Sequence, residues 1–288
     1  MTNALHAAHY ADRACQQRVV VLENVRLGRD TFRIRFHCPQ LARRIVPGQF
    51  VMLRLADCND PLLGRPLALY DTVLSDGVPV GIDVVYLVMG KMTSRLAQTL
   101  PGQALEVWGP LGNGFPPHET EHLVMVAGGI GQTPFLALAS EYLSQNRYGE
   151  PARSVQKARR VTLCYGARSQ DYLAGIEDFK RLGVEVRTST DDGSAGHHGL
   201  VTDLLKQELA ASKDCRVVCC GPERMMEAVA HITQAAGVPC QVSLETPMAC
   251  GIGICFSCVA RVRDASGGWD YRRTCVEGPV FDATSLEW

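Results

Sequence analysis

Short runs of alternating apolar and polar residues, separated by turn residues, fill the first hundred positions of the chain. Alternation with a period of two is typical of strands that bury one face. Turn signals such as Pro47-Gly48 separate the runs. Only Lys91–Thr99 is expected to be helical, with Thr93 as a plausible cap. The pattern predicts an antiparallel β-barrel, with strands at Arg18–Arg26, Thr31–His37, Phe50–Leu55, Leu67–Val73, Gly81–Val88 and Ala104–Trp108.

The pattern changes near residue 120, where apolar runs begin to alternate with segments of helical periodicity. Such alternation predicts an α/β unit, a parallel sheet with helices on both faces. The expected strands are Leu123–Ala127, Arg160–Tyr165, Val184–Ser189 and Arg216–Cys220. The expected helices are Phe135–Leu143, Tyr172–Leu182, Val201–Ala211 and Glu223–Ala236.

A glycine-rich turn joins the first of these strands to its helix. The turn reads Gly128-Gly129-Ile130-Gly131-Gln132-Thr133-Pro134, and its glycines are expected to allow close approach of a phosphate. Pro134 stands where a dinucleotide fingerprint has its third glycine. The last strand ends at Cys220, before Gly221-Pro222, at the edge where such sheets bind ligands. Cys220 is therefore a candidate site residue, although a small core thiol is an equally good interpretation.

Four of the twelve cysteines have the spacing of a metal cluster. Cys250, Cys255 and Cys258 follow the pattern C-x4-C-x2-C, and Cys275 comes later. This spacing is typical of a plant-type [2Fe–2S] cluster. Gly251 and Gly253 are expected to let the loop bring its amides near the sulfurs. A structural zinc site remains an alternative, although such sites usually combine two C-x2-C pairs.

Composition mainly excludes classes of function. A chain of 288 residues favours two or three domains. The net charge of −1 provides no basic surface for nucleic acid. No apolar run reaches the length of about eighteen residues that a membrane-spanning helix needs. Twelve cysteines without a secretory signal indicate a reducing compartment, which argues against disulfides and predicts a cytoplasmic location.

Two stretches of the expected barrel are candidates for binding a nucleotide cofactor. Arg65-Pro66-Leu67-Ala68 places a cation beside an extended backbone, and Gly90-Lys91-Met92-Thr93-Ser94 precedes a helix, whose N-terminus can bind phosphate. Each motif alone is more typical of a surface turn or a helix cap. Together they could hold a pyrophosphate and a flat ring.

The order of these motifs resembles the ferredoxin–NADP reductase superfamily. The C-terminal run Cys250-Gly-Ile-Gly-Ile-Cys255-Phe-Ser-Cys258-Val, with Arg-Thr-Cys275-Val-Glu-Gly-Pro, is more specific. It resembles the electron-transfer subunits of NAD-dependent (class B) dihydroorotate dehydrogenase. The resemblance covers nearly all of residues 18–283.

The resemblance implies the cofactors FAD, NAD and a [2Fe–2S] cluster, and it implies where each one binds. Ala68 departs from the family pattern by lacking a hydroxyl, and Met92 stands where glycine is common. Arg168 and Ser169 leave NADP possible. The implied FAD-binding residues are Arg65, Pro66, Leu67, Ala68, Val85, Tyr86, Leu87, Gly90, Lys91, Met92 and Thr93. The implied NAD-binding residues are Gly128, Gly129, Gly131, Thr133, Pro134, Gly221 and Pro222, with Cys220 as the catalytic candidate beside the nicotinamide.

The same resemblance implies an activity and a division into domains. A catalytic FMN-containing partner subunit would oxidise dihydroorotate, in pyrimidine biosynthesis, and pass electrons through the cluster and FAD to NAD+. One alternative is the flavin–iron–sulfur subunit of a soluble hydrogenase or of a ferredoxin–NADP transhydrogenase. Another is a redox-inert zinc-binding module. The expected parts are a tail (1–14), an FAD-binding β-barrel (15–117), an NAD-binding α/β domain (118–240) and a [2Fe–2S] domain (241–288).

Overall fold

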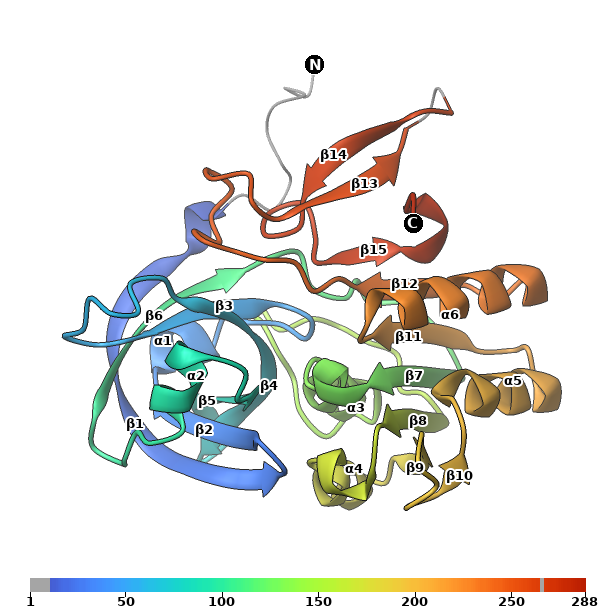
Figure 1. Cartoon of the computed structure of the whole chain (residues 1–288), viewed down its shortest axis with the longest axis horizontal. Helices are drawn as coiled ribbons and strands as arrows, with labels where there is room; N and C mark the ends of the chain where they lie inside the picture. Colours follow the sequence, from blue (N-terminus) through green and yellow to red (C-terminus); the bar gives the residue numbers. More distant parts are fainter. Residues whose placement is uncertain (1–10, 265–266) are drawn as a thin grey trace.

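The structure is a computed structural model that describes residues 11–264 and 267–288. Most of the expected tail, residues 1–10, therefore lies outside the described part. The described chain forms a closed barrel, a seven-stranded sheet and a two-stranded hairpin (Figure 1). The sequence thus correctly predicted a β-barrel joined to an α/β unit.

The barrel contains β1 (Cys15–Gly28), β2 (Thr31–His37), β3 (Phe50–Leu55), β4 (Arg65–Ser75), β5 (Val78–Leu87) and β6 (Ala104–Leu111), with the short helices α1 (Pro39–Ala42) and α2 (Lys91–Leu96). The sheet region contains β7 (His122–Gly128), α3 (Phe135–Tyr142), β8 (Arg160–Ala167), α4 (Ile176–Arg181), β9 (Glu185–Thr190), β10 (His197–His198), α5 (Val201–Ala211), β11 (Arg216–Cys220), α6 (Glu223–Ala236) and β12 (Cys240–Ser243). The last segment contains β13 (Val259–Arg263), β14 (Trp269–Arg273) and β15 (Val280–Asp282).

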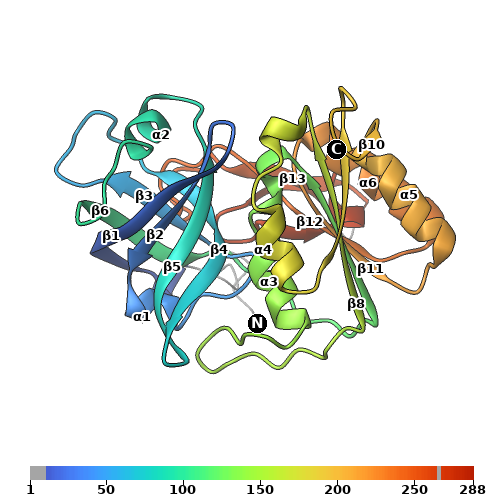
Figure 2. The same cartoon turned by 90° about the horizontal axis from the view of Figure 1, so that it is seen from below.

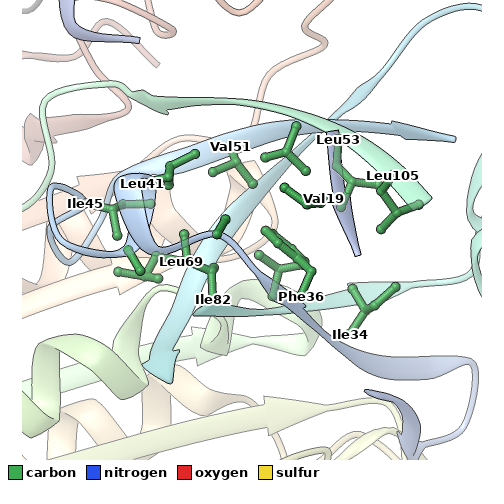
Figure 3. Packing of buried hydrophobic residues seen from close by; sticks show 14 of the residues in the cluster. Val19, Ile34, Phe36, Leu41, Ile45, Val51, Leu53, Leu69, Ile82 and Leu105 are labelled. Carbon is green, nitrogen blue, oxygen red and sulfur yellow. The ribbon is translucent and has the colours of Figure 1, made fainter. Parts of the chain in front are cut away.

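The barrel closes in the order β1-β2-β5-β4-β3-β6, and all of its strand pairs are antiparallel. Apolar side chains that alternate along the strands fill its interior, together with Leu41 and Ile45 near α1 (Figure 3). The expectation of one helix in this region was wrong, because α1 is a single turn and too short to show a helical period. The cap of α2 is Gly90, and the Thr93 hydroxyl accepts a hydrogen bond from its amide over 3.2 Å.

The sheet has the strand order β10-β9-β8-β7-β11-β12-β15. Its strands run parallel except for β15, which is antiparallel to β12. Helices α3 and α4 lie on the face toward the barrel, and α5 and α6 cover the other face (Figure 2). The helix expected over Tyr172–Leu182 was too long. It begins at Ile176, because Gly175 has a left-handed backbone with φ of +75° and Gln170–Tyr172 forms a separate 3-10 turn.

The C-terminal segment contributes to two parts of the fold. Strand β12 crosses the expected boundary between residues 240 and 241, and β15 returns to the sheet from beyond Cys275. Between them, β13 and β14 form a hairpin that stands apart from the barrel and the sheet (Figure 1). None of these strands, which are three to five residues long, was expected from the sequence.

Buried polar contacts fasten the barrel to the sheet region. The Tyr70 hydroxyl on β4 donates to Asp178 on α4 over 2.8 Å. The Tyr148 hydroxyl, in the loop after α3, donates to Asp71 on β4 over 2.6 Å. Apolar side chains from both parts pack together around these bonds, including Val85 and Phe115. The two parts therefore hold their candidate sites in a fixed relationship.

Candidate cofactor sites

The residues expected to hold FAD lie on two neighbouring strands. Leu69 on β4 is opposite Val84 on β5, which is the last pair at this end of the ladder. Beyond it, Arg65–Ala68 pair with β3 and Val85–Leu87 pair with β2. Arg65 is exposed, and its guanidinium donates to the carbonyls of Leu63 and Gly64. The two strand segments thus extend from the same paired position, Leu69 and Val84, and together they form the strip on which FAD was expected.

Two of the expected FAD-binding side chains point away from this strip. Tyr86 is 1% exposed within the barrel, stacks on Phe32 at 5.9 Å between ring centroids, and donates to Asn24. Leu67 also packs against the barrel interior. At both positions only the backbone would be available to contact a cofactor on the outer strip.

The turn before α2 is open where a phosphate was expected. A Cβ built on Gly90 would have no heavy atom within 4 Å. Met92 is 1% exposed because its side chain packs in the barrel core, so its bulk does not fill this space. Lys91 is exposed and forms an ion pair with Asp60. The departure at Met92 therefore leaves room for the cofactor.

The glycine loop after β7 packs directly against the turn after β11. A Cβ on Gly131 would lie 2.2 Å from the carbonyl oxygen of Cys220, and one on Gly128 would lie 2.8 Å from Pro222 Cδ. Gly129 has φ of +56°, and a Cβ there would meet open space. The physical reason for Gly131 thus differs from the expected one. It permits contact between two protein loops, whereas Gly129 borders the space that a nucleotide could use.

Cys220 lies at the carboxyl edge of the sheet, 3% exposed, beside Glu245. Its Sγ donates to Glu245 Oε1 over 3.8 Å. Burial, and secondly the Glu245 carboxyl, raise the pKa of Cys220 well above its usual value, so the thiol stays protonated at neutral pH. Part of the Glu245 side chain is exposed to solvent. Desolvation of its carboxyl by the surrounding protein nevertheless raises the pKa of Glu245. Sequence reasoning missed Glu245, because β12, which positions it, carries no strand signal.

The four expected cluster ligands form two pairs. Ser257 and, more weakly, the Cys250 thiol lower the pKa of Cys255 to about 6. The Cys275 thiol lowers the pKa of Cys258 to about 6. Within the described residues, no three His, Cys, Asp or Glu side chains lie close enough to share a single metal ion. The spacing C-x4-C-x2-C with a fourth cysteine remains the feature that favours a [2Fe–2S] cluster over a structural zinc site, which usually combines two C-x2-C pairs.

The loop between Cys250 and Cys255 has the conformation that its glycines were expected to allow. Gly251 and Gly253 have φ of +74° and +82°, and a Cβ on Gly251 would lie 2.6 Å from Met52 Cγ. The Ile252 amide donates to Cys250 Sγ over 3.4 Å, so a backbone donor does reach a ligand sulfur. Cys255 is exposed, whereas Cys258 and Cys275 are buried.

Three family profiles match consecutive parts of the chain. They describe an oxidoreductase FAD-binding domain (residues 18–115), an oxidoreductase NAD-binding domain (residues 125–231) and the iron–sulfur cluster binding domain of dihydroorotate dehydrogenase B (residues 245–287). The match at residues 245–287 spans all four cluster cysteines.

Curated relatives are similar over nearly the whole chain. The electron transfer subunit of dihydroorotate dehydrogenase B (NAD(+)) from Desulforamulus reducens is 35% identical over 260 residues, which cover 90% of this chain and 93% of the relative. The corresponding subunit from Fusobacterium nucleatum is 31% identical over 272 residues, which cover 93% and 96%.

Solved structures share the architecture. A NADH-dependent reduced ferredoxin–NADP oxidoreductase, studied for flavin-based electron bifurcation, superposes with a TM-score of 0.77 at 29% identity, covering 94% of this chain and 90% of that one. The ferredoxin reductase of carbazole 1,9a-dioxygenase superposes with a TM-score of 0.65 at 18% identity over 78% and 67%, which shows a common fold. Among the described residues, no helix is long and apolar enough to cross a membrane.

Proposed function

Because the chain belongs to the family of electron-transfer subunits of dihydroorotate dehydrogenase B, we propose that it passes electrons from dihydroorotate oxidation to NAD+. The oxidation itself takes place on an FMN-containing catalytic partner subunit, and the pathway is pyrimidine biosynthesis. The family assignment rests on relatives such as the Desulforamulus reducens subunit, which is 35% identical over 90% of this chain. The observation that carries the function is that Cys250, Cys255, Cys258 and Cys275 all lie within the stretch that matches the family's cluster domain.

The cofactors supply the redox chemistry: a [2Fe–2S] cluster carries single electrons, FAD exchanges one or two, and NAD+ accepts a hydride. The protein's own task is to bind and orient them. Cys250, Cys255, Cys258 and Cys275 hold the cluster. The strip Arg65–Ala68 with Val85–Leu87, and the turn at Gly90–Thr93, hold FAD on the barrel.

Gly128–Pro134 and the turn at Gly221–Pro222 would hold the nucleotide. Gly129 offers open space that a pyrophosphate could use. Cys220 would stand beside the nicotinamide as a neutral thiol, because its raised pKa keeps the proton on sulfur. A thiolate there would be a nucleophile and would compete with hydride transfer, so protonation protects the nicotinamide.

We propose that the chain divides into a tail (1–14), an FAD-binding barrel (15–117), an NAD-binding domain (118–240) and a cluster domain (241–288). The profile matches over 18–115, 125–231 and 245–287 support it. Strands β12 and β15 extend the NAD-binding sheet from the cluster side. We also propose a cytoplasmic location, which the twelve free thiols support.

A relative with 29% identity belongs to a ferredoxin–NADP oxidoreductase, so the second candidate is a subunit that exchanges electrons with ferredoxin and NADP. The test mixes the reconstituted chain with the FMN-containing catalytic subunit encoded in the same genome. Dihydroorotate-dependent reduction of NAD+ is expected, with NADP+ reduced much more slowly. Electron exchange with ferredoxin but not with that subunit would establish the second candidate instead.

The same assay distinguishes a defect at the cluster from a defect at the nucleotide site. A Cys255→Ser variant is expected to lose dihydroorotate-dependent NAD+ reduction and to keep oxidation of NADH by a small acceptor that reacts with FAD. If this variant keeps FAD and yet fails with the small acceptor, the proposed order of cofactors is wrong.

A further inference from the structure

The β13–β14 hairpin grows out of the cluster site. Strand β13 begins directly after Cys258, and β14 ends two residues before Cys275 (Figure 1). Its register pairs Arg261 with Tyr271 and Arg263 with Trp269. Residues paired in this way, and residues two apart along a strand, point to the same face. The hairpin is therefore joined at both of its ends to an expected cluster ligand.

The two faces of the hairpin differ in what covers them. On one face, Val262 forms a bridge to Leu286 and packs with the core behind the sheet. On the other face, Trp269 and Tyr271 are 44% and 55% exposed, with ring centroids 5.2 Å apart. The Arg261 guanidinium lies over the Trp269 ring at 5.4 Å, and no carboxylate of the described residues forms an ion pair with it.

This face continues to the exposed cluster ligand. Arg273 on β14 lies over the ring of Phe256 at 5.1 Å. Phe256 directly follows Cys255, has φ of +57° and leaves its side chain 63% exposed. A left-handed backbone is strained for a bulky residue such as phenylalanine, and most of the ring stays exposed in the isolated chain. We call Arg261, Trp269, Tyr271, Arg273 and Phe256 the aromatic–arginine face.

We propose that the aromatic–arginine face is the surface on which the catalytic partner subunit docks, with a partner carboxylate against Arg261. The inference rests on the proposed function, which requires a partner close to the cluster. Tryptophan, tyrosine and arginine are the residues enriched at the centres of protein interfaces. Docking there covers the strained Phe256 and brings the partner beside Cys255, the cluster ligand that is exposed.

A second copy of this chain is a poorer occupant than the partner. A two-fold contact through this face would cover Arg261 without giving it a carboxylate partner, because the nearby Glu287 and Glu277 already pair with Arg263 and Arg273. Covering an unpaired cation opposes association. An acidic surface on a different protein would give the Arg261 guanidinium a carboxylate partner and would cover the exposed rings of Trp269 and Tyr271 at the same time.

The test measures binding of the cluster-loaded full chain to the purified FMN-containing catalytic subunit by sedimentation velocity and biolayer interferometry. Tyr271→Ala and Arg261→Glu are each expected to raise the Kd at least tenfold, and Arg261→Glu also to weaken the salt dependence of the association rate. Matched controls on exposed barrel positions are Leu100→Ala and Arg44→Glu, which should keep the Kd within twofold. Iron content and NADH oxidation by a small acceptor should not change in any of the four variants.

The outcomes separate this proposal from the proposed function. If the unaltered chain does not bind the catalytic subunit, the proposed function fails. If it binds and both hairpin variants bind within twofold of it, only the docking surface is wrong. If the Tyr271→Ala variant loses iron, the affinity of the Arg261→Glu variant alone tests the docking surface. The Arg261 side chain is exposed and contacts none of the four cluster cysteines. A dimer of the isolated chain that dissociates on Tyr271→Ala, with partner affinity unchanged, would also overturn the proposal.

Discussion

The indole Nε1 of Trp108 donates a hydrogen bond of 3.0 Å to the backbone carbonyl of Cys250, the first of the four cluster cysteines. Trp108 lies on β6 of the barrel, and the far edge of its ring contacts the loop before Arg65. A Cβ on Gly64 would lie only 2.7 Å from its Cη2 atom. One side chain thus touches both the loop expected to bind FAD and the loop expected to bind the cluster. It also lines a cavity of about 640 Å3 between them.

Trp108→Phe removes the N–H donor and keeps most of the ring. We expect the cluster to be retained and the free energy of unfolding to fall by about 1 kcal/mol, because the Cys250 carbonyl loses its donor. The reduction potential of the cluster should also shift, since the loop around Cys250 is held less firmly. Denaturant unfolding and redox-titrated electron paramagnetic resonance measure the two effects. A variant that matches the parent in both would show that the bond has no influence on the loop.

Gly131 and Gly129 are expected to respond differently to alanine. Gly131→Ala places a methyl group 2.2 Å from the carbonyl oxygen of Cys220. This oxygen belongs to the backbone, which cannot move away without a large cost in free energy. We expect a loss of at least about 2 kcal/mol in stability. Gly129→Ala costs about 1 kcal/mol for its left-handed backbone, but its methyl group meets open space. It should remain folded and raise the KM for NADH. Thermal unfolding and NADH kinetics give the comparison, and equal stability of the two variants would contradict the loop contact.

Serine in place of any one of Cys250, Cys255, Cys258 or Cys275 is expected to remove most of the iron and sulfide, because serine does not replace a thiolate that bridges protein to iron. Cys15→Ser is the matched control, since Cys15 lines the same cavity without belonging to either thiol pair. Chemical analysis of anaerobically prepared protein should find two irons per chain in the parent and in the control. One zinc per chain and no iron would identify a zinc site.

Asp71 is expected to make stability depend on pH. Burial raises the pKa of Asp71 to about 6, although the Tyr148 hydroxyl and the Thr72 amide partly oppose this shift. Because the pKa is higher in the folded state, this carboxyl contributes its full stability below about pH 4, and that contribution is lost as pH rises through 6.

An Asp71→Asn variant keeps an oxygen for Tyr148 and cannot ionise. Its stability relative to the parent should therefore increase between pH 4.5 and pH 7, by about 2 kcal/mol. Urea unfolding at the two pH values measures this difference, in which the other titrating groups cancel. Asp76→Asn, in the exposed turn after β4, is the control and should show no such change. A constant difference between Asp71→Asn and the parent would mean that Asp71 ionises normally.

The sequence alone determined the elements whose signals are local. Strands β2 and β3 and helices α5 and α6 have the bounds that their apolar periods predicted, because period two and period 3.6 need no information from distant residues. The spacing of Cys250, Cys255 and Cys258 likewise indicated a cluster, since one short loop supplies three of its ligands. The family and its cofactors followed from these local motifs and are confirmed by the relatives.

Only the tertiary structure decided which way the site side chains face and what each glycine touches. Tyr86 and Met92 stand within motifs of the flavin site, yet both side chains lie in the barrel core, because strand and helix faces are fixed by barrel closure. Gly131 is required by Cys220, 89 positions later. Glu245 reaches Cys220 and Trp108 reaches Cys250 only because separate segments fold side by side. Contacts of this kind join residues far apart in the chain, and no local pattern of hydrophobicity encodes them.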